Sequence, residues 1–96
     1  MWTTKKESWG SDAMLFVTYN SPAPMTADQI AAGVQAIWQV LRNEGVDEAT
    51  VYALQGQARK TLNGLVQMAL LYAINLAFRR LRNGGWRLEV RGLRHG

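Results

Sequence analysis

The stretch 25-MTADQIAAGVQAIWQVLRNEGV-46 carries a complete set of helix signals, and the rest of the chain can be interpreted outward from it. Thr26 is a preferred N-cap residue, and Gln29 three positions later can complete a capping box. Apolar residues then recur at the three- and four-residue spacing of one helix face. Gly45 follows where a left-handed residue commonly ends a helix. The sequence therefore predicts a helix over residues 27–44.

Two short segments on either side of this helix have the composition of β-strands. Residues 13–19, AMLFVTY, are rich in β-branched and aromatic side chains and are followed by a proline-containing turn. Both faces of this segment are apolar, so we expect a strand that is mostly covered. Residues 86–91, WRLEVR, alternate strictly between apolar and charged side chains, which is typical of a strand with one face in water.

The region 47–82 keeps a helical spacing of apolar residues almost throughout. Asp47 can cap a second helix, and the glycines at 84 and 85 follow the last apolar turn, as expected at a helix end. One glycine costs only ~1 kcal/mol in a helix, so the region can form either one bent helix or two helices with a break near Gly56. We favour the break.

These elements predict an α+β fold dominated by helix, in the order strand, helix, helix (with a third helix after the break) and strand. We expect the two terminal strands to pair with each other and to pack on the helical hairpin. A ribbon of two strands is marginal alone, so a homodimer that joins two ribbons is also expected. Residues 1–12 are predicted to be a polar tail, 13–92 a single domain and 93–96 a second tail.

Catalytic and metal-binding groups are sparse in this chain of 96 residues. It has no cysteine, and its one histidine, His95, is the penultimate residue. Acid–base and nucleophilic catalysis need a reactive group beside a partner that activates it. The acidic cluster of Glu44, Asp47 and Glu48 falls at a helix junction, where capping and the helix dipole account for it. We therefore expect neither an enzyme nor a bound metal or cofactor.

The net charge of +4 is unevenly distributed along the chain. Residues 1–57 hold three basic side chains and six acidic ones, whereas residues 58–96 hold eight basic side chains and Glu89 alone. Such asymmetry favours a polyanionic partner, an acidic protein surface or head-to-tail self-association.

The candidate partner-binding surface is the arginine-rich C-terminal segment. Arginine suits two-pronged recognition of carboxylates and phosphates. An ordinary structural explanation also exists, because basic residues suit a helix C-terminus and alternating charges mark the wet face of a strand. The candidate residues are Arg79, Arg80, Arg82, Arg87, Arg91 and Arg94.

Three tryptophans are possible aromatic anchors for a partner, because tryptophan is enriched at interface hot spots. Trp2 and Trp9 stand in an otherwise polar segment. The alternative, which we favour, is that one or both fold back over the core. Trp86 alternates with the arginines of its strand and is expected to anchor that strand to the core.

The uncharged stretch 62–78, flanked by basic pairs, is just at the short limit for crossing a membrane. Its polar residues are periodic, which favours a core helix instead. The N-terminus lacks the apolar region of a secretory signal, so the cytoplasm is the expected location.

Taken together, the sequence favours a small non-enzymatic binding or regulatory module, of the general build of phage or plasmid inhibitors and adaptors. We expect it to act by protein–protein contact through its basic surface and to form a homo-oligomer, with a dimer favoured. The alternative is a protein that binds DNA or RNA through the C-terminal arginine and tryptophan segment. A membrane-associated role through residues 62–78 ranks third.

Overall fold

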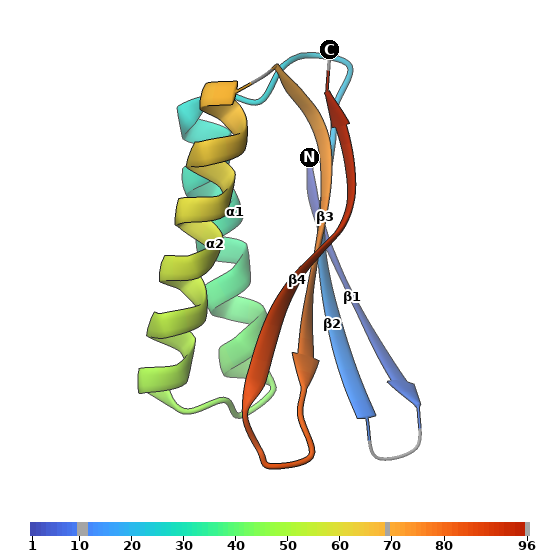
Figure 1. Cartoon of the computed structure of the whole chain (residues 1–96), viewed down its shortest axis with the longest axis vertical. Helices are drawn as coiled ribbons and strands as arrows, with labels where there is room; N and C mark the ends of the chain where they lie inside the picture. The colour runs from blue at the N-terminus through green and yellow to red at the C-terminus, as the bar shows by residue number, and fades with distance from the viewer. Residues whose placement is uncertain (10–11, 69, 96) are drawn as a thin grey trace.

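A four-stranded antiparallel sheet and two helices make up the fold, and both helices lie on the same side of the sheet (Figure 1). The computed structural model describes residues 1–9, 12–68 and 70–95. The strands lie in the order β1-β2-β3-β4 across the sheet, which is also their order in the chain. The elements are β1 (Trp2–Trp9), β2 (Asp12–Asn20), α1 (Ala27–Asn43), α2 (Glu48–Met68), β3 (Leu71–Arg80) and β4 (Trp86–His95).

The first helix, α1, confirms the prediction made from its end signals. The Thr26 Oγ1 accepts a hydrogen bond from the Gln29 N–H at 3.3 Å, and the Gln29 Oε1 accepts one from the Thr26 N–H at 2.8 Å. At the other end Gly45 has a φ of 78°. The Val46 N–H then donates to the Leu41 carbonyl at 3.2 Å, which is the long-range bond of a Schellman ending.

The region 47–82 differs from its prediction in two ways. The second helix runs through Gly56 without a break and ends at Met68, because ~1 kcal/mol for one exposed glycine is too little to interrupt a helix that packs on the core. Residues 71–80 are the strand β3, so the predicted helix over them is wrong. A continuous apolar run fits a buried helix and a central strand equally well. Pairing with β2 on one side and β4 on the other decides for the strand.

The chain ends also differ from the prediction. Residues 2–9, expected to be part of a polar tail, form β1 and pair with residues 12–19 of β2, with Trp2 opposite Tyr19. An edge strand with one face in water can be almost entirely polar, so no apolar alternation marks it in the sequence. Residues 93–95, also expected to be a tail, extend β4.

The predicted strands at 13–19 and 86–91 exist as β2 and β4, but they do not pair with each other, because β3 lies between them. The predicted helix-dominated α+β fold is therefore wrong in two respects, the proportion of helix to strand and the pairing of the strands. Strands of 8, 9, 10 and 10 residues accompany helices of 17 and 21 residues. The two helices pack on a four-stranded sheet and not on a ribbon of two strands.

The core lies between the helices and the sheet. Each central strand sends alternate side chains into this layer, where the helices cover them. The helices cover only one face of β2, yet every residue of 13–19 is buried or half-buried, so the strand is mostly covered as predicted. The largest fully buried side chains are those of Tyr19, Phe78, Leu15, Ile37, Leu41, Leu62, Leu71, Ile74, Leu76, Val17 and Val51.

Trp2 at the start of β1 closes one side of the core. Its indole Nε1 donates a hydrogen bond to the Gln29 carbonyl at 2.7 Å, and its ring lies 5.3 Å from that of Tyr19. The indole packs directly on Gly33 in α1, where the absence of a Cβ leaves room for it. Trp2 therefore folds back over the core, as the favoured alternative predicted.

Tyr19 provides a first test of this core. Its side chain is fully buried, and its hydroxyl has no hydrogen-bond partner among the described residues. A buried hydroxyl without a partner costs about 1–3 kcal/mol. Tyr19→Phe is therefore expected to leave the free energy of unfolding unchanged or to raise it by about 1 kcal/mol, measured by urea denaturation. Tyr52→Phe, at a residue that is 77% exposed, serves as the control and should change nothing. A clear loss of stability in Tyr19→Phe would contradict the unpaired hydroxyl.

Candidate partner-binding surface

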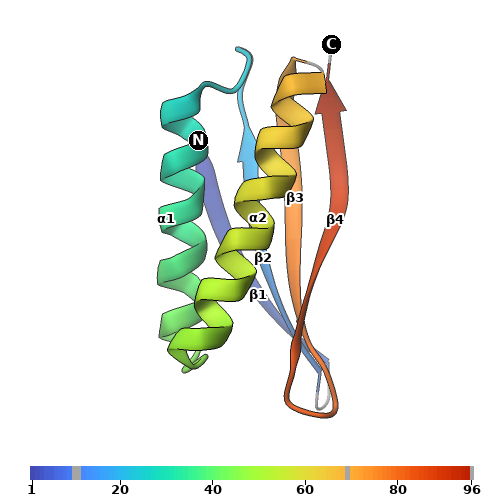
Figure 2. The same cartoon turned by 60° about the vertical axis from the view of Figure 1, so that its left-hand side comes forward.

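The sheet has one face against the helices, which lie in front of it in Figure 2, and one face that no described element covers (Figure 1). We call the second the open face. Successive residues of a strand point to opposite faces. Since Leu15, Val17 and Tyr19 are buried under the helices, Met14 and Phe16 belong to the open face, where both are half-buried.

The strand register places four of the six candidate arginines on the open face. Residues directly opposite each other in an antiparallel pair share a face. Arg79 lies opposite Met14 on one side and Arg87 on the other, so all three face away from the helices. Arg94 lies opposite Ala73, which in turn lies opposite Asn20 of β2.

Arg91 reaches the open face through a β-bulge. Leu76 pairs with Val90 and the preceding Asn75 pairs with Gly92, so Arg91 is an extra residue in β4. A bulge redirects the side chain of the extra residue. Here the Arg91 guanidinium extends across β3 to the Sδ of Met14, 3.9 Å away.

The other two candidate arginines lie elsewhere. Arg80 is opposite Trp86, which packs against the core, so Arg80 is on the helix side at the end of the hairpin. Arg82 is in the connection between β3 and β4. The arginine segment is thus divided between two faces and a turn, and Arg79, Arg87, Arg91 and Arg94 are brought together.

Glu89 orders two of these arginines. Its Oε2 lies 3.0 Å from the Arg91 Nε, and its Oε1 lies 3.9 Å from the Arg87 Nε. Exposed ion pairs of this kind contribute at most about 1 kcal/mol to stability. Their structural effect is to hold the guanidinium groups over the sheet. At the opposite edge Lys5 lies across from Phe16 and is paired with Glu7 at 3.1 Å.

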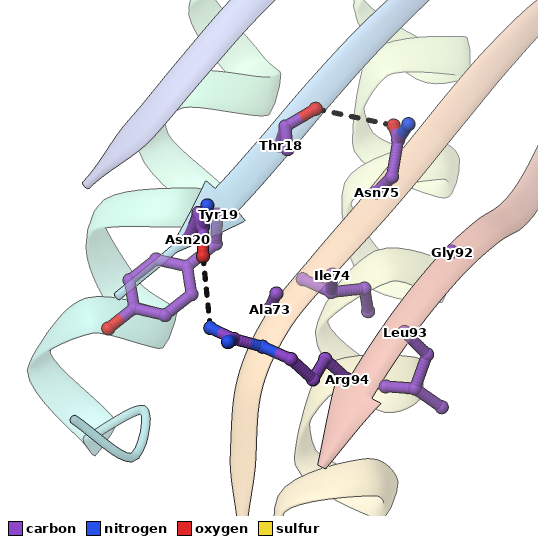
Figure 3. Close-up of a pocket in the computed structure, with 9 residues that line it drawn as sticks. All are labelled: Thr18, Tyr19, Asn20, Ala73, Ile74, Asn75, Gly92, Leu93 and Arg94. Atoms are coloured by element: carbon purple, nitrogen blue, oxygen red, sulfur yellow. Dashed lines mark hydrogen bonds between the residues drawn. The ribbon is translucent and has the colours of Figure 1, made fainter. Parts of the chain in front are cut away.

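A shallow hollow of about 430 Å³ lies on the open face near the end of β4 (Figure 3). The small residues Ala73 and Gly92 are among those that line it. The Arg94 Nη2 donates to the Asn20 Oδ1 and to the Ser21 carbonyl, both at 3.1 Å. Arg94 is the only charged side chain among the residues that line the hollow.

The polar wall of the hollow is formed by Thr18 and Asn75. The Thr18 Oγ1 donates to the Asn75 Oδ1 at 3.3 Å (Figure 3). This bond uses the carbonyl end of the amide, and Asn75 also carries an N–H₂ group. A guanidinium and an amide N–H₂ are both hydrogen-bond donors. The hollow is therefore suited to a carboxylate or another acceptor group.

Phe16 is an aromatic side chain on the open face that was not among the predicted site residues. A second ring lies beside the hollow, where the Arg94 guanidinium carbon is 5.8 Å from the centre of the Tyr72 ring. Trp86 is half-buried against the core on the other side of the sheet, as predicted. The side chain of Trp9 lies outside the described part of the structure. No local signal marked Phe16, because both faces of residues 13–19 are rich in apolar side chains and only the packing of the helices decides which face is covered.

The acidic cluster at the helix junction has structural partners. Glu44 pairs with Lys6 at 2.9 Å, and Glu48 pairs with Arg42 at 3.1 Å. Asp47 caps α2 by accepting hydrogen bonds from the Thr50 hydroxyl and the Thr50 N–H, and these two bonds lower the pKa of Asp47 below its ordinary value. Within residues 1–9, 12–68 and 70–95, no three His, Asp or Glu side chains gather as a metal site would require.

The uncharged stretch 62–78 is divided between α2 and β3 rather than forming one helix. In the part of the chain that the structure describes, neither helix has the length and apolar character needed to cross a membrane.

These features define a two-layer protein with the element order ββααββ and a basic open face. Comparison with protein-family models, with curated proteins and with solved structures finds no match to this chain.

Proposed function

We propose that this protein is a non-enzymatic binding module that docks the open face of its sheet on an acidic surface of another protein. The observation that carries this proposal is that Arg79 and Arg91 lie beside the half-buried Met14 and share one uncovered face with Arg87 and the half-buried Phe16. Arginine, methionine and aromatic residues are the types enriched at protein interfaces. An inhibitor or adaptor that acts in the cytoplasm by occupying its partner fits this build.

The composition of the open face favours a protein over a nucleic acid. Glu89 and Glu7 lie within it, and carboxylates repel a phosphate backbone but can pair with basic side chains of a protein. Single-stranded nucleic acids also need aromatic rings on which bases stack. Trp2 and Trp86 pack on the helix side, so among the described side chains the rings available for stacking are the smaller ones of Phe16 and of Tyr72 beside Arg94.

Nucleic-acid binding remains the second candidate, because the same arginines could contact phosphates. The two candidates differ in their dependence on salt, since phosphate contacts make affinity fall steeply as salt rises. The hollow beside Arg94 would hold an acidic side chain of the partner under the first proposal and a phosphate under the second.

The test compares two double variants of the tagged 96-residue chain, each expressed in the organism from which the protein comes. Arg79→Ala/Arg91→Ala removes charge from the open face, and Arg59→Ala/Lys60→Ala removes the same charge from the exposed side of α2. We expect a partner protein to co-purify with the natural chain even after nuclease treatment. The amount of this partner recovered should fall about tenfold or more with the first variant and stay unchanged with the second. Quantitative mass spectrometry gives the readout.

Two results would contradict the proposal. A partner lost equally from both double variants would place the binding surface away from the open face. Recovery of nucleic acid by absorbance ratio, with gel shifts of single-stranded oligonucleotides that disappear as salt rises, would establish the second candidate instead.

A further inference from the structure

The two edges of the sheet differ in how they are protected against pairing with another strand. At the β1 edge, Lys6 lies opposite the buried Leu15, so it points to the helix side, where it binds the Glu44 Oε2 at 2.9 Å. An inward-pointing lysine is a common device that blocks strand addition. In the segment of β4 before the bulge at Arg91, the helix-side residues are Trp86, Leu88 and Val90, so no charged side chain points inward there.

Part of this β4 edge is exposed and apolar. Val90 is 46% exposed and Leu93 is 44% exposed, although both lie on the side of the sheet that carries the core. Edge strands with exposed apolar side chains and no charged guard favour pairing with a further strand. The charges along β4 indicate which strand would pair with it.

The segment Trp86–Val90 is complementary to itself in the antiparallel direction. When two copies are aligned about Leu88, Arg87 of each copy lies opposite Glu89 of the other, on the open face. On the helix side Leu88 meets its own copy, and Trp86 meets Val90. We propose that a second copy of this chain pairs along β4 in this register and joins the two sheets into one continuous sheet.

Within each copy, the ion pairs of Glu89 leave one of its carboxylate oxygens weakly engaged and able to pair with Arg87 of the second copy. The Glu89 Oε2 is engaged by Arg91 at 3.0 Å, whereas its Oε1 lies 3.9 Å from Arg87, a loose contact. The Oε1 is therefore the atom that would receive Arg87 of the second copy. Opposite charges placed directly across an antiparallel pair stabilise it.

The bulge at Arg91 sets the length of the paired segment. Beyond it the alternation of faces shifts by one residue, since Glu89 and Gly92 both lie on the open face. A straight ladder therefore covers residues 86–90 and ends at the bulge. Alignment about Leu93 would instead place Arg91 opposite His95 and leave Glu89 without a partner, so it lacks the charge complementarity.

This inference concerns the edge of the sheet and does not rest on the function proposed for its open face. Pairing along β4 would leave both open faces accessible and set them side by side. A chain that is monomeric and still binds its partner would refute the pairing alone, whereas a dimer with no partner would refute the proposed function alone.

The first experiment blocks the edge and measures mass by analytical ultracentrifugation. Val90→Lys copies onto β4 the guard that Lys6 provides on β1. Thr4→Lys is the control, because it introduces a lysine on the helix side of the other edge strand, β1, where Thr4 lies opposite Val17. We expect the natural chain to be dimeric, Val90→Lys to raise the dimer dissociation constant about tenfold or more, and Thr4→Lys to leave it unchanged. A natural chain that remains monomeric at high micromolar concentration would overturn the proposal.

The second experiment exchanges the paired charges. Arg87→Glu and Glu89→Arg should each weaken the dimer about tenfold, because each places like charges opposite one another. The combined variant Arg87→Glu/Glu89→Arg restores opposite charges and should recover the dimer. Failure of the combined variant to recover, with the fold intact by circular dichroism, would exclude this register.

Cysteine cross-linking tests the register directly, because the chain contains no natural cysteine. Leu88→Cys should form a disulfide-linked dimer under mild oxidation. Val90→Cys should not, since in this register the two Val90 positions are four residues apart, about 14 Å at ~3.4 Å per residue, which exceeds the ~7 Å limit for a disulfide. Cross-linking of Leu93→Cys in place of Leu88→Cys would show a different alignment and overturn the one proposed.

Discussion

Gly33→Ala is expected to destabilise the protein by about 2–4 kcal/mol, even though alanine is the better helix former. A Cβ at position 33 would overlap the indole ring of Trp2. That ring is rigid and is held by its hydrogen bond to the Gln29 carbonyl at 2.7 Å. The ring must therefore leave its site, which exposes apolar surface and breaks the bond. Urea denaturation measures the loss.

Two other helical glycines supply the control. Space is open around a Cβ built at Gly56 or Gly64 in α2, so alanine at either position should raise stability by about 0.5–1 kcal/mol. The same substitution is thus expected to have opposite signs in the two helices. In a Trp2→Ala background, Gly33→Ala should lose most of its cost, as a double-mutant cycle would show. A Gly33→Ala variant as stable as Gly56→Ala would contradict the seating of Trp2 on α1.

Phe78→Ala should cost about 3–5 kcal/mol, the range for truncation of a fully buried aromatic side chain. Phe78 is 0% exposed and lies between Leu15 and Leu88 in the layer under the helices. A small domain has only about 5–15 kcal/mol of stability in total. The variant is therefore expected to be partly unfolded at moderate temperature, measured by thermal denaturation followed by circular dichroism.

Phe16→Ala is the matched substitution on the other face of the sheet. Phe16 is half-buried, so its truncation should cost only about 1 kcal/mol. Under the proposed function it should also weaken partner binding about tenfold or more, because an aromatic residue at the centre of an interface is a common hot spot. Equal losses of stability in the two variants would mean that the open face is covered, which would contradict the proposed docking surface.

The candidate surface was only partly predictable from the sequence. The arginines at 79, 87, 91 and 94 could be identified as a cluster, but their common face depends on the register of β3 and β4 and on the bulge at Arg91. Arg80 and Arg82 belong to the same cluster in sequence and lie off that face in the structure. Phe16 lacked a local signal, since its exposure follows from which side of β2 the helices cover.

Local sequence determined the elements whose signals are complete within a few residues. The helix α1 has its N-cap, apolar face and C-terminal glycine within residues 25–46, and β2 and β4 have strand composition between turn residues. Tertiary structure alone decided β1 and β3. β1 is polar and forms by pairing with β2 and by seating Trp2 on Gly33. β3 has residues that suit a helix and becomes a strand because its backbone bonds to two neighbours at once, a contribution that no local pattern contains.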